Sequence, residues 1–285
     1  MPNEHDLFNL GSRRAMSNLR RLVSYGTMKA GLAIVIFSVL VSIIGLFYTP
    51  YNPLAPVGPS LSPPSLQFLM GTNNIGQDIF SQWLVGARYT LIEGLLTAIF
   101  ATALGVPIGM LSGFFRILDT PLMRLTDTIL ALPTLPLMIV IGSFIKLNIY
   151  DVAILVAILS WTFSARTVRS GLMTLKTEPF VEVAIMSGVP KTTILFKDLG
   201  KHILGIIVSY GLFSTITGII TVASLQFIGA FTFPYGWGAI LAIAYQSDAL
   251  LSDAWWWLII PGISIAFVLM GFALVSYSLE VYYKK

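Results

Sequence analysis

The chain contains no cysteine among its 285 residues and only two histidines, His5 and His202. Without thiols it has neither disulfides nor cysteine-based metal sites, and two histidines are too few for a histidine-based metal site. Charge is also scarce, because only 11% of the residues are Asp, Glu, Lys or Arg, whereas soluble domains carry about 25%. These shortages exclude an ordinary soluble domain and favour a membrane protein.

Apolar residues are abundant and occur in long blocks. They make up 56% of the chain, and the blocks are long enough to cross a hydrocarbon core of about 30 Å as helices. Helices are expected because a spanning backbone must satisfy its own hydrogen bonds. The sequence predicts an all-α polytopic membrane protein with six transmembrane helices, at residues 31–48, 90–114, 125–145, 152–167, 202–227 and 254–281.

The distribution of positive charge predicts the orientation. With the N-terminus in the cytoplasm, 15 of the 17 lysines and arginines fall on cytoplasmic segments, and only Arg88 and Lys146 fall outside. Such a bias is typical of cytoplasmic loops, so both termini are predicted inside. The predicted organisation is a cytoplasmic segment at 1–30, a first membrane helix at 31–48, an extracytoplasmic connector at 49–89, a five-helix core at 90–281 that includes a polar cytoplasmic segment at 177–201, and a cytoplasmic tail at 282–285.

Two segments that are predicted to lie outside have compositions typical of a connector and of a turn. Residues 50–65 hold six prolines, which predicts a semi-rigid, extended connector. The segment FTFPYGWG at 231–238 combines aromatic residues with Gly and Pro, which favours a packed turn at the membrane surface.

The motifs of several enzyme classes are missing. No GxxxxGK[ST] phosphate loop, HExxH or GxSxG motif occurs, so the chain is not expected to hydrolyse ATP by itself, and no catalytic residue is predicted. Glu93 is the only acidic residue deep in a predicted span. It could face a water-filled path, but we favour a carboxylate that reaches for headgroup water or a neighbouring helix.

The longest polar interval is TEPFVEVAIMSGVPKTTILFKDLGKH, at 177–202. Thr177 is the expected helix cap, and Pro179 suits the first turn. Gly188 permits a tight turn, after which Pro190 can open a second helix that leads into the fifth span. Small residues at this corner would let another protein approach closely: Ala184, Ser187 and Gly188.

Part of this interval resembles the EAA signature of ABC-importer permeases. In VEVAIMSG, at 181–188, Glu182, Ala184 and Gly188 match the signature, while Val183 replaces its first alanine. Gly200 and Lys201 stand where the signature usually has Leu-Pro. The resemblance implies a short cytoplasmic helix that docks into a groove on an ATPase. The implied ATPase-coupling residues are Glu182, Ala184, Ser187 and Gly188; Glu182 would pair with a basic group there, the alternative being a solvated carboxylate that contributes little.

Four further segments carry the same resemblance in the same order. GTNNIGQDIFSQWLVGAR at 71–88 is similar to the GTDxxGRDxxSRxxxGAR segment of dipeptide/oligopeptide permeases, with Asn73, Gln77 and Gln82 in place of charged residues. The others are LMRLTDTILALPTLPLMI at 122–139, WTFSARTVRSGLMTLK at 161–176, and GWG at 236–238 together with WWWLIIPG at 255–262. The family's C-terminal NLxGDxLRD pattern is absent. The chain most resembles the C-type subunit of the permease pair.

This resemblance implies a type I ABC-importer permease fold in a prokaryotic cell membrane. It implies a heterodimer with a second homologous permease, two ABC ATPase subunits that bind ATP and Mg, and an extracytoplasmic substrate-binding protein. No cofactor is implied in this chain. The implied cargo is oligopeptides or similar polar solutes, with oligosaccharides possible.

Two further sets of residues leave alternatives open. A polar stripe on the fifth predicted span, Tyr210, Ser214, Thr217, Thr221 and Ser224, has the spacing of one helix face. Ser214, Thr217 and Thr221 could line the translocation path, or the stripe could serve close helix packing. Arg166 and Arg169 could contact the ATPase, but we favour anchoring to lipid headgroups.

The rival functions are a stand-alone channel or ion-coupled secondary transporter, and a membrane scaffold. A channel or carrier should show charges in mid-membrane or paired broken helices, and the sequence shows neither convincingly. Only the importer interpretation requires a stoichiometric ATPase partner.

Overall fold

The computed structural model describes residues 26–145, 147–230 and 236–283, and these residues form helices and loops. Five helical runs are long and apolar enough to cross a membrane. They are α2 (Gly26–Phe47), α3 (Ile79–Phe114), α6 (Ile149–Leu175), the run Lys191–Ile228, and α11 (Trp255–Tyr283). The predicted all-α polytopic fold is confirmed. The clusters Arg13–Arg14 and Arg20–Arg21 and the residues Lys146, Lys284 and Lys285, all used for the orientation, lie outside the described residues.

The third predicted span, at 125–145, is bent and is not one continuous helix. Two helices, α4 (Arg116–Leu130) and α5 (Thr134–Phe144), meet at a bend of 72°. Pro133 lies at the break, and proline both lacks an N–H donor and disfavours helical geometry in the residue before it. If the bent pair counts as one broken span, the number of spans is six.

Other helix ends differ from the prediction for identifiable reasons. The helix α3 begins at Ile79 rather than at residue 90, because the Asp78 side chain caps it by accepting from the Ser81 N–H at 2.8 Å. The helix α6 begins at Ile149, where Asn148 and Asp151 form a capping box, and it continues to Leu175. Each helix therefore extends past its apolar block into polar surroundings.

The proline-rich connector has no helix, as expected, but the prediction that it is extended is wrong. Its backbone folds onto residues 71–78 through four bonds: Val57 N–H to Gly76 O (2.8 Å), Gly58 N–H to Gly76 O (3.1 Å), Leu61 N–H to Asn73 O (3.0 Å), and Thr72 N–H to Ser62 O (2.9 Å). In the last predicted outer segment, α10 (Trp237–Gln246) begins at the last two residues of FTFPYGWG. Phe231 to Tyr235, the first part of the predicted turn, lies outside the described residues.

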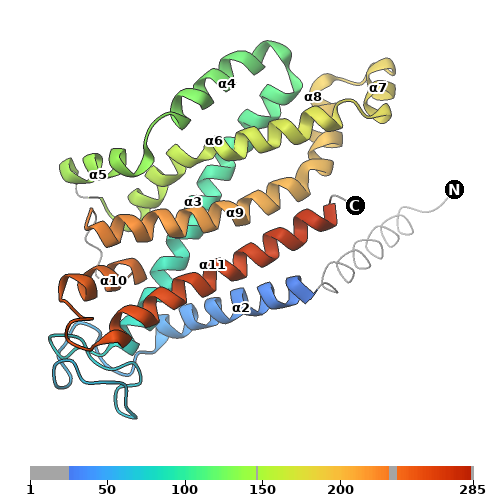
Figure 1. Ribbon diagram of the computed structural model, residues 1–285. Coiled ribbons are helices and arrows are strands. Elements are labelled where there is room, and N and C mark those ends of the chain that lie inside the picture. The colour runs from blue at the N-terminus through green and yellow to red at the C-terminus, as the bar shows by residue number, and fades with distance from the viewer. Residues whose placement is uncertain (1–25, 146, 231–235, 284–285) are drawn as a thin grey trace.

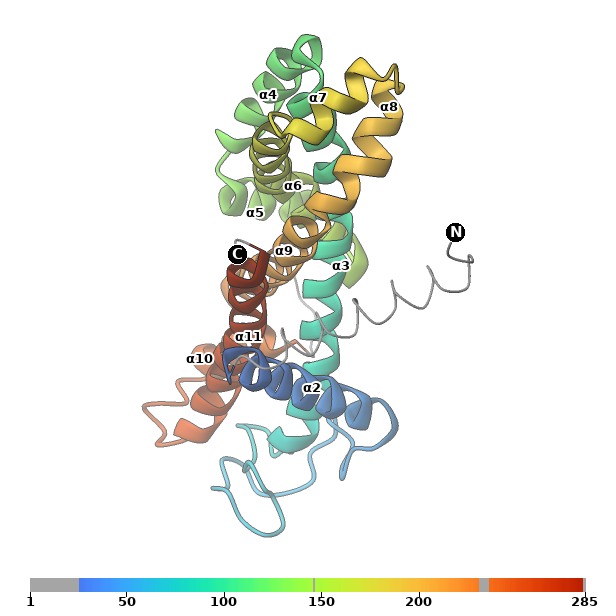
Figure 2. The ribbon, with the colours of Figure 1, turned by 90° about the vertical axis from the view of Figure 1, so that its right-hand side faces the viewer.

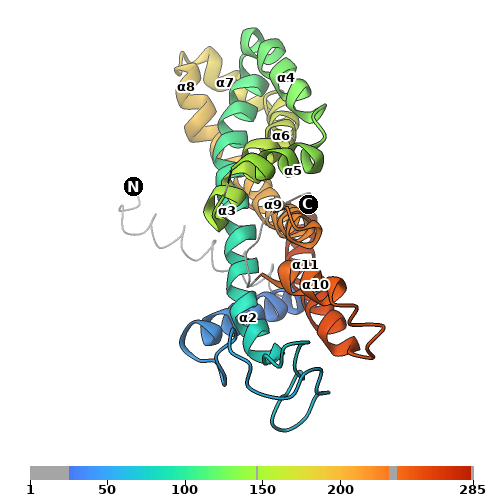
Figure 3. The same ribbon diagram turned by 90° about the vertical axis from the view of Figure 1, so that its left-hand side faces the viewer.

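The connector and the polar interval lie at opposite ends of the molecule. In Figure 1 the connector is at the lower left, and α7 (Pro179–Met186) and α8 (Lys191–Thr193) are at the upper right. The same separation is seen in Figures 2 and 3. One apolar cluster near the connector includes Trp237 and Trp257, and another near α7 includes Phe114 and Leu172. The long helices join these two ends.

Candidate functional site

The polar interval folds as a helix, a tight corner and a return, as predicted. The predicted cap is wrong by one residue, because Glu178 is the N-cap of α7 and Pro179 follows at its first position. The Thr177 hydroxyl instead donates to the Thr174 carbonyl at 2.8 Å. Proline at this position loses no intrahelical bond, since the first N–H groups of a helix have no partner there.

Gly188 forms the corner in the left-handed conformation, with φ +74°. Its N–H donates to the Ile185 carbonyl at 3.1 Å, and the Val189 N–H donates to the Ala184 carbonyl at 3.1 Å. These two bonds are the pattern of a Schellman motif, which ends a helix with a glycine. The chain then enters α8 after Pro190. The predicted turn at Gly188 and helix start at Pro190 are confirmed.

The helix α7 has an inner and an outer face. Val181 is fully buried and Ala184 is half-buried against the same apolar cluster. Ser187 and Gly188 are exposed, so they lie at the accessible corner, whereas Ala184 lies on the inner side. The outer side also exposes three apolar side chains: Val183 (57%), Ile185 (47%) and Met186 (81%). An exposed apolar face on so short a helix is typical of a protein contact.

Glu182 is exposed on α7. Among the described residues, the ion pairs are formed by Arg166 and Arg169, and no basic side chain lies within ion-pair distance of Glu182. Its carboxylate is therefore available to a basic group on another protein.

Aromatic stacking fixes α7 against the helix that follows the corner. The rings of Phe180 and His202 lie 5.0 Å apart, with an interplanar angle of 23°. The Nδ1 atom of His202 is 2.8 Å from the Asp198 carbonyl oxygen one turn earlier. Together with buried Val181, this contact joins α7 firmly to the return helix.

The return helix runs without a break from Lys191 to Ile228, through the π-helical turn η1 (Ile194–Leu199) and into α9 (Gly200–Ile228). The Gly200 N–H donates to the Leu195 carbonyl, which closes the wider turn. Gly200 and Lys201 both supply backbone N–H groups, so no interruption occurs where the family signature has proline. The predicted fifth span at 202–227 is therefore the C-terminal part of a longer helical run.

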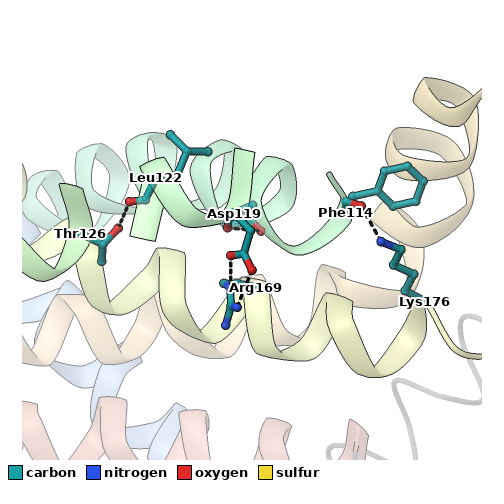
Figure 4. Close-up of polar contacts among 8 residues, drawn as sticks. Phe114, Asp119, Leu122, Thr126, Arg169 and Lys176 are labelled. Atoms are coloured by element: carbon teal, nitrogen blue, oxygen red, sulfur yellow. Dashed lines mark hydrogen bonds and ion pairs between the residues drawn. The ribbon is translucent and has the colours of Figure 1, made fainter. Parts of the chain in front are cut away.

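Arg166 and Arg169 each form an ion pair within the chain, which neither interpretation of these residues anticipated. Headgroup anchoring and contact with an ATPase both stay predictions. Arg169 forms a two-bond ion pair with Asp119 of α4, at 2.6 and 2.8 Å (Figure 4). Arg166 pairs with Asp127 of the same helix. Lys176, at the end of α6, donates to the Phe114 carbonyl at 2.6 Å. The carboxylates of Asp119 and Asp127 on α4 were the feature of the sequence that could have indicated these pairs. The pairs fix α4 along α6.

The candidate path residues on α9 differ in exposure. Ser214 is 7% exposed, whereas Thr217 and Thr221 are half-buried. The Thr217 hydroxyl donates to the Phe213 carbonyl at 3.2 Å, and Ser224 donates in the same way to Ile220 at 2.7 Å. These hydroxyls are therefore partly satisfied by their own helix.

On the side of the molecule nearer the connector, α3 and α9 are tied together by buried polar contacts. Glu93 is 2% exposed and accepts from the Gln226 side-chain amide at 2.7 Å. Beside it, the Trp237 N–H of α10 donates to the Thr90 hydroxyl at 3.1 Å. Glu93 thus contacts a neighbouring helix, which was one of the two contacts in the favoured interpretation. Within the described residues, no group of three His, Cys, Asp or Glu side chains could hold a metal ion.

Comparison with known proteins gives a consistent result. Residues 105–284 match the family model described as binding-protein-dependent transport system inner membrane component. A putative peptide transport system permease protein of Brucella abortus is 28% identical over 278 residues, which cover 96% of this chain and 93% of that protein. The di/tripeptide transport system permease protein DppC of Pseudomonas aeruginosa is 29% identical and covers 89% and 87%. The dipeptide permease DppC of Haemophilus influenzae is 26% identical and covers 86% of each chain.

Proposed function

Because the chain belongs to the family of binding-protein-dependent transport system inner membrane components, we propose that it forms half of the translocation path of an ATP-driven peptide importer. It is a multi-pass permease of a prokaryotic cell membrane. The names of its relatives, which refer to peptides, dipeptides or di- and tripeptides, support peptides as cargo. Oligosaccharides or similar polar solutes are the alternative cargo. Family membership does not support a stand-alone channel or an ion-coupled carrier.

A permease of this class works with ATPase subunits and a binding protein. In our proposal the complete transporter holds this chain, a second homologous permease, two ABC ATPases that bind ATP and Mg²⁺, and one extracytoplasmic binding protein. The chain itself binds no nucleotide and needs no cofactor. The excess of lysine and arginine on one set of segments supports an orientation with the α7 corner in the cytoplasm and the connector outside.

The coupling step is assigned to the segment 177–201, which we name the coupling segment. The observation that carries this assignment is a short helix with an exposed apolar face and the unpaired Glu182, held against a helical run of 38 residues. ATP binding closes the two ATPases and displaces the docked α7. The run Lys191–Ile228 is about 57 Å long at 1.5 Å per residue, so it can transmit that displacement toward the outer end as a rigid body.

Charge reversal at Glu182 tests the coupling assignment. In proteoliposomes that contain the complete transporter and its binding protein, Glu182→Lys is expected to reduce peptide uptake at least about tenfold, because losing a charged contact costs about 1.5–3 kcal/mol. ATPase subunits should still co-purify through the apolar face of α7. The measurements are uptake, ATP hydrolysis and subunit stoichiometry of the same preparation.

Glu178 supplies the matched control. It is exposed on the same segment and its side chain makes no capping bond, so Glu178→Gln should leave uptake unchanged while Glu182→Gln lowers it. Uptake by the Glu182→Lys transporter at the rate of the unsubstituted one would reject the coupling role.

The path assignment of Ser214, Thr217 and Thr221 belongs to the same proposal. Single cysteines at these positions can be labelled from either side, since the chain has no native cysteine. Thr217→Cys and Thr221→Cys are expected to react with a water-soluble thiol reagent in at least one nucleotide state, and buried Ser214→Cys only after the helices rearrange. A complete lack of reaction at Thr217 and Thr221 in all states would show that the stripe serves helix packing.

A further inference from the structure

Arg88 lies where three membrane helices meet at the end nearer the connector. It belongs to the early turns of α3, beside Leu46 near the end of α2 and Ile149 at the start of α6. Tyrosines border the same region: Tyr48, Tyr89 and Tyr150. Arginine and tyrosine are typical of the boundary between hydrocarbon and headgroups, where an aromatic ring can sit beside a charged group.

The charge of Arg88 is not neutralised by a carboxylate within the described residues, whose ion pairs involve Arg166 and Arg169. Its guanidinium carbon lies 4.7 Å from the centre of the Tyr89 ring, and its Nη2 atom donates to the Tyr89 hydroxyl at 2.9 Å. A guanidinium has five N–H donors in a fixed fork that suits phosphate oxygens. The tyrosine therefore orients the fork and leaves donors for a further acceptor.

Arg88 lines two cavities. One, of about 330 Å³, is lined toward the connector by Tyr48, Thr49 and Pro53. The other, of about 450 Å³, is lined by the apolar Ile43 and Ile92 of the membrane helices. Leu46, Arg88 and Tyr89 line both cavities. Arg88 thus lies between the smaller cavity, which has a polar lining, and the larger cavity, which follows the apolar membrane helices.

We propose that Arg88 and these two cavities bind an anionic glycerophospholipid. Its phosphodiester accepts from the Arg88 guanidinium, its headgroup occupies the cavity beside Thr49, and an acyl chain follows Ile43 and Ile92 into the membrane. The net positive charge favours an anionic lipid over a zwitterionic one, whose ammonium would meet the same cation. Ile43 is 48% exposed and Leu46 is 51% exposed, so the acyl side of the site is open to the bilayer. The proposal depends on the membrane location of the chain and on neither the cargo nor the coupling step.

Lipid quenching tests the site directly. Leu40 is exposed on α2 and lines neither cavity, so Leu40→Cys can carry a bimane fluorophore beside the acyl side of the site. The complete transporter is reconstituted in phosphatidylcholine nanodiscs with a small, equal fraction of dibrominated phosphatidylglycerol or dibrominated phosphatidylcholine. The signal of complexes without the engineered cysteine is subtracted. The brominated anionic lipid is expected to quench about fivefold more effectively, since one arginine near a membrane surface contributes about that preference.

Three variants separate the possible results. Arg88→Gln should lower the quenching ratio to about one, and Arg88→Lys should retain part of it because the charge remains without the fork. Arg116→Gln, which removes an exposed cation at the first residue of α4, should leave the ratio unchanged. Equal quenching by the two lipids before any substitution would overturn the proposal. Competition by excess inorganic phosphate would also overturn the proposal, because it would indicate a site for free anions. A third contradicting result is an Arg88→Gln complex that loses the second permease while the quenching ratio stays unchanged, which would indicate a protein contact.

Discussion

Three residues in the connector region replace charged residues of the family pattern and contact one another. The pattern GTDxxGRDxxSR has Asp, Arg and Arg where this chain has Asn73, Gln77 and Gln82. The Gln77 side-chain oxygen accepts from Asn73 and from Gln82, both at 2.8 Å. Gln77 and Gln82 also donate to the carbonyls of Leu54 and Pro53. All three amides are buried, so a neutral network occupies a place where the family pattern has charges.

This network predicts strong coupling between its members. Gln77→Arg alone buries a cation without a carboxylate and is expected to destabilise the fold by about 3 kcal/mol. Adding Asn73→Asp should recover most of that loss, because the pair then reproduces the charges of the family pattern. The thermal unfolding midpoint of the purified complex measures both effects. Gln67→Arg, in an exposed part of the connector, is the matched control and should change little; a double variant no more stable than Gln77→Arg would refute the coupling.

At the residue scale, the sequence predicted conformation better than contact. Gly188 was expected in a tight turn and adopts φ +74°, because a glycine before Val-Pro leaves few other ways to end α7. The partners of Arg169 could not be predicted, because they depend on how α4 lies along α6. The inward position of Ala184 could not be predicted either, because both faces of α7 carry apolar residues.

At the element scale, α3 and α6 pack through glycines at every fourth position. An added methyl group on Gly105, Gly109 or Gly113 would lie 2.5, 2.5 or 3.0 Å from the carbonyl oxygen of Trp161, Ala165 or Arg169, respectively. Such small residues let membrane helices approach closely where lipid supplies no hydrophobic drive. The GxxxGxxxG spacing was present in the sequence and would have predicted this contact.

Substitution within this seam is expected to be costly. Gly109→Ala should destabilise the complex by about 1–3 kcal/mol, because the carbonyl that it meets belongs to the backbone and cannot rotate away. Gly109→Leu should prevent accumulation of the permease in the membrane. Gly211→Ala is the matched control in another membrane helix, since its methyl group would lie 3.7 Å from the Thr102 hydroxyl. The thermal unfolding midpoint is measured for the two alanine variants, and the membrane yield is measured for Gly109→Leu. Equal changes in the midpoint for Gly109→Ala and Gly211→Ala would contradict the close packing.

The bend between α4 and α5 shows why the element boundaries were harder to predict than the elements. Composition predicted a span at 125–145, but Asp119 and Asp127 pair with α6 and keep α4 beside it. Pro133 then permits the 72° change of direction. A window of apolar residues measures length and not direction, so it could not distinguish a straight span from a bent pair.

At the scale of the whole molecule, the chain links a coupling segment at one end to a network of polar contacts at the other. The run Lys191–Ile228 carries α7 near its start and Gln226 near its end. Gln226 binds Glu93 of α3, and Thr90 on the same helix binds α10. The order of the spans was predictable from the sequence, but contacts between residues more than 130 positions apart, such as Glu93 with Gln226, were not.

This arrangement predicts that α7 and α9 move together during transport. Phe180 and His202 stack across the two helices, so the double variant Phe180→Cys/His202→Cys can be joined by a short bis-methanethiosulfonate linker. If the two helices form one rigid body, joining them should leave peptide uptake within about twofold of the unlinked double variant, because no relative motion is lost. Uptake is measured before linking, after linking and after reduction. The single-cysteine variants, treated with the same reagent, control for modification alone. If uptake falls at least about tenfold on linking and returns on reduction, α7 must move relative to α9 during transport. The displacement of the ATPases would then reach the other end of the molecule by a route that does not pass through α9.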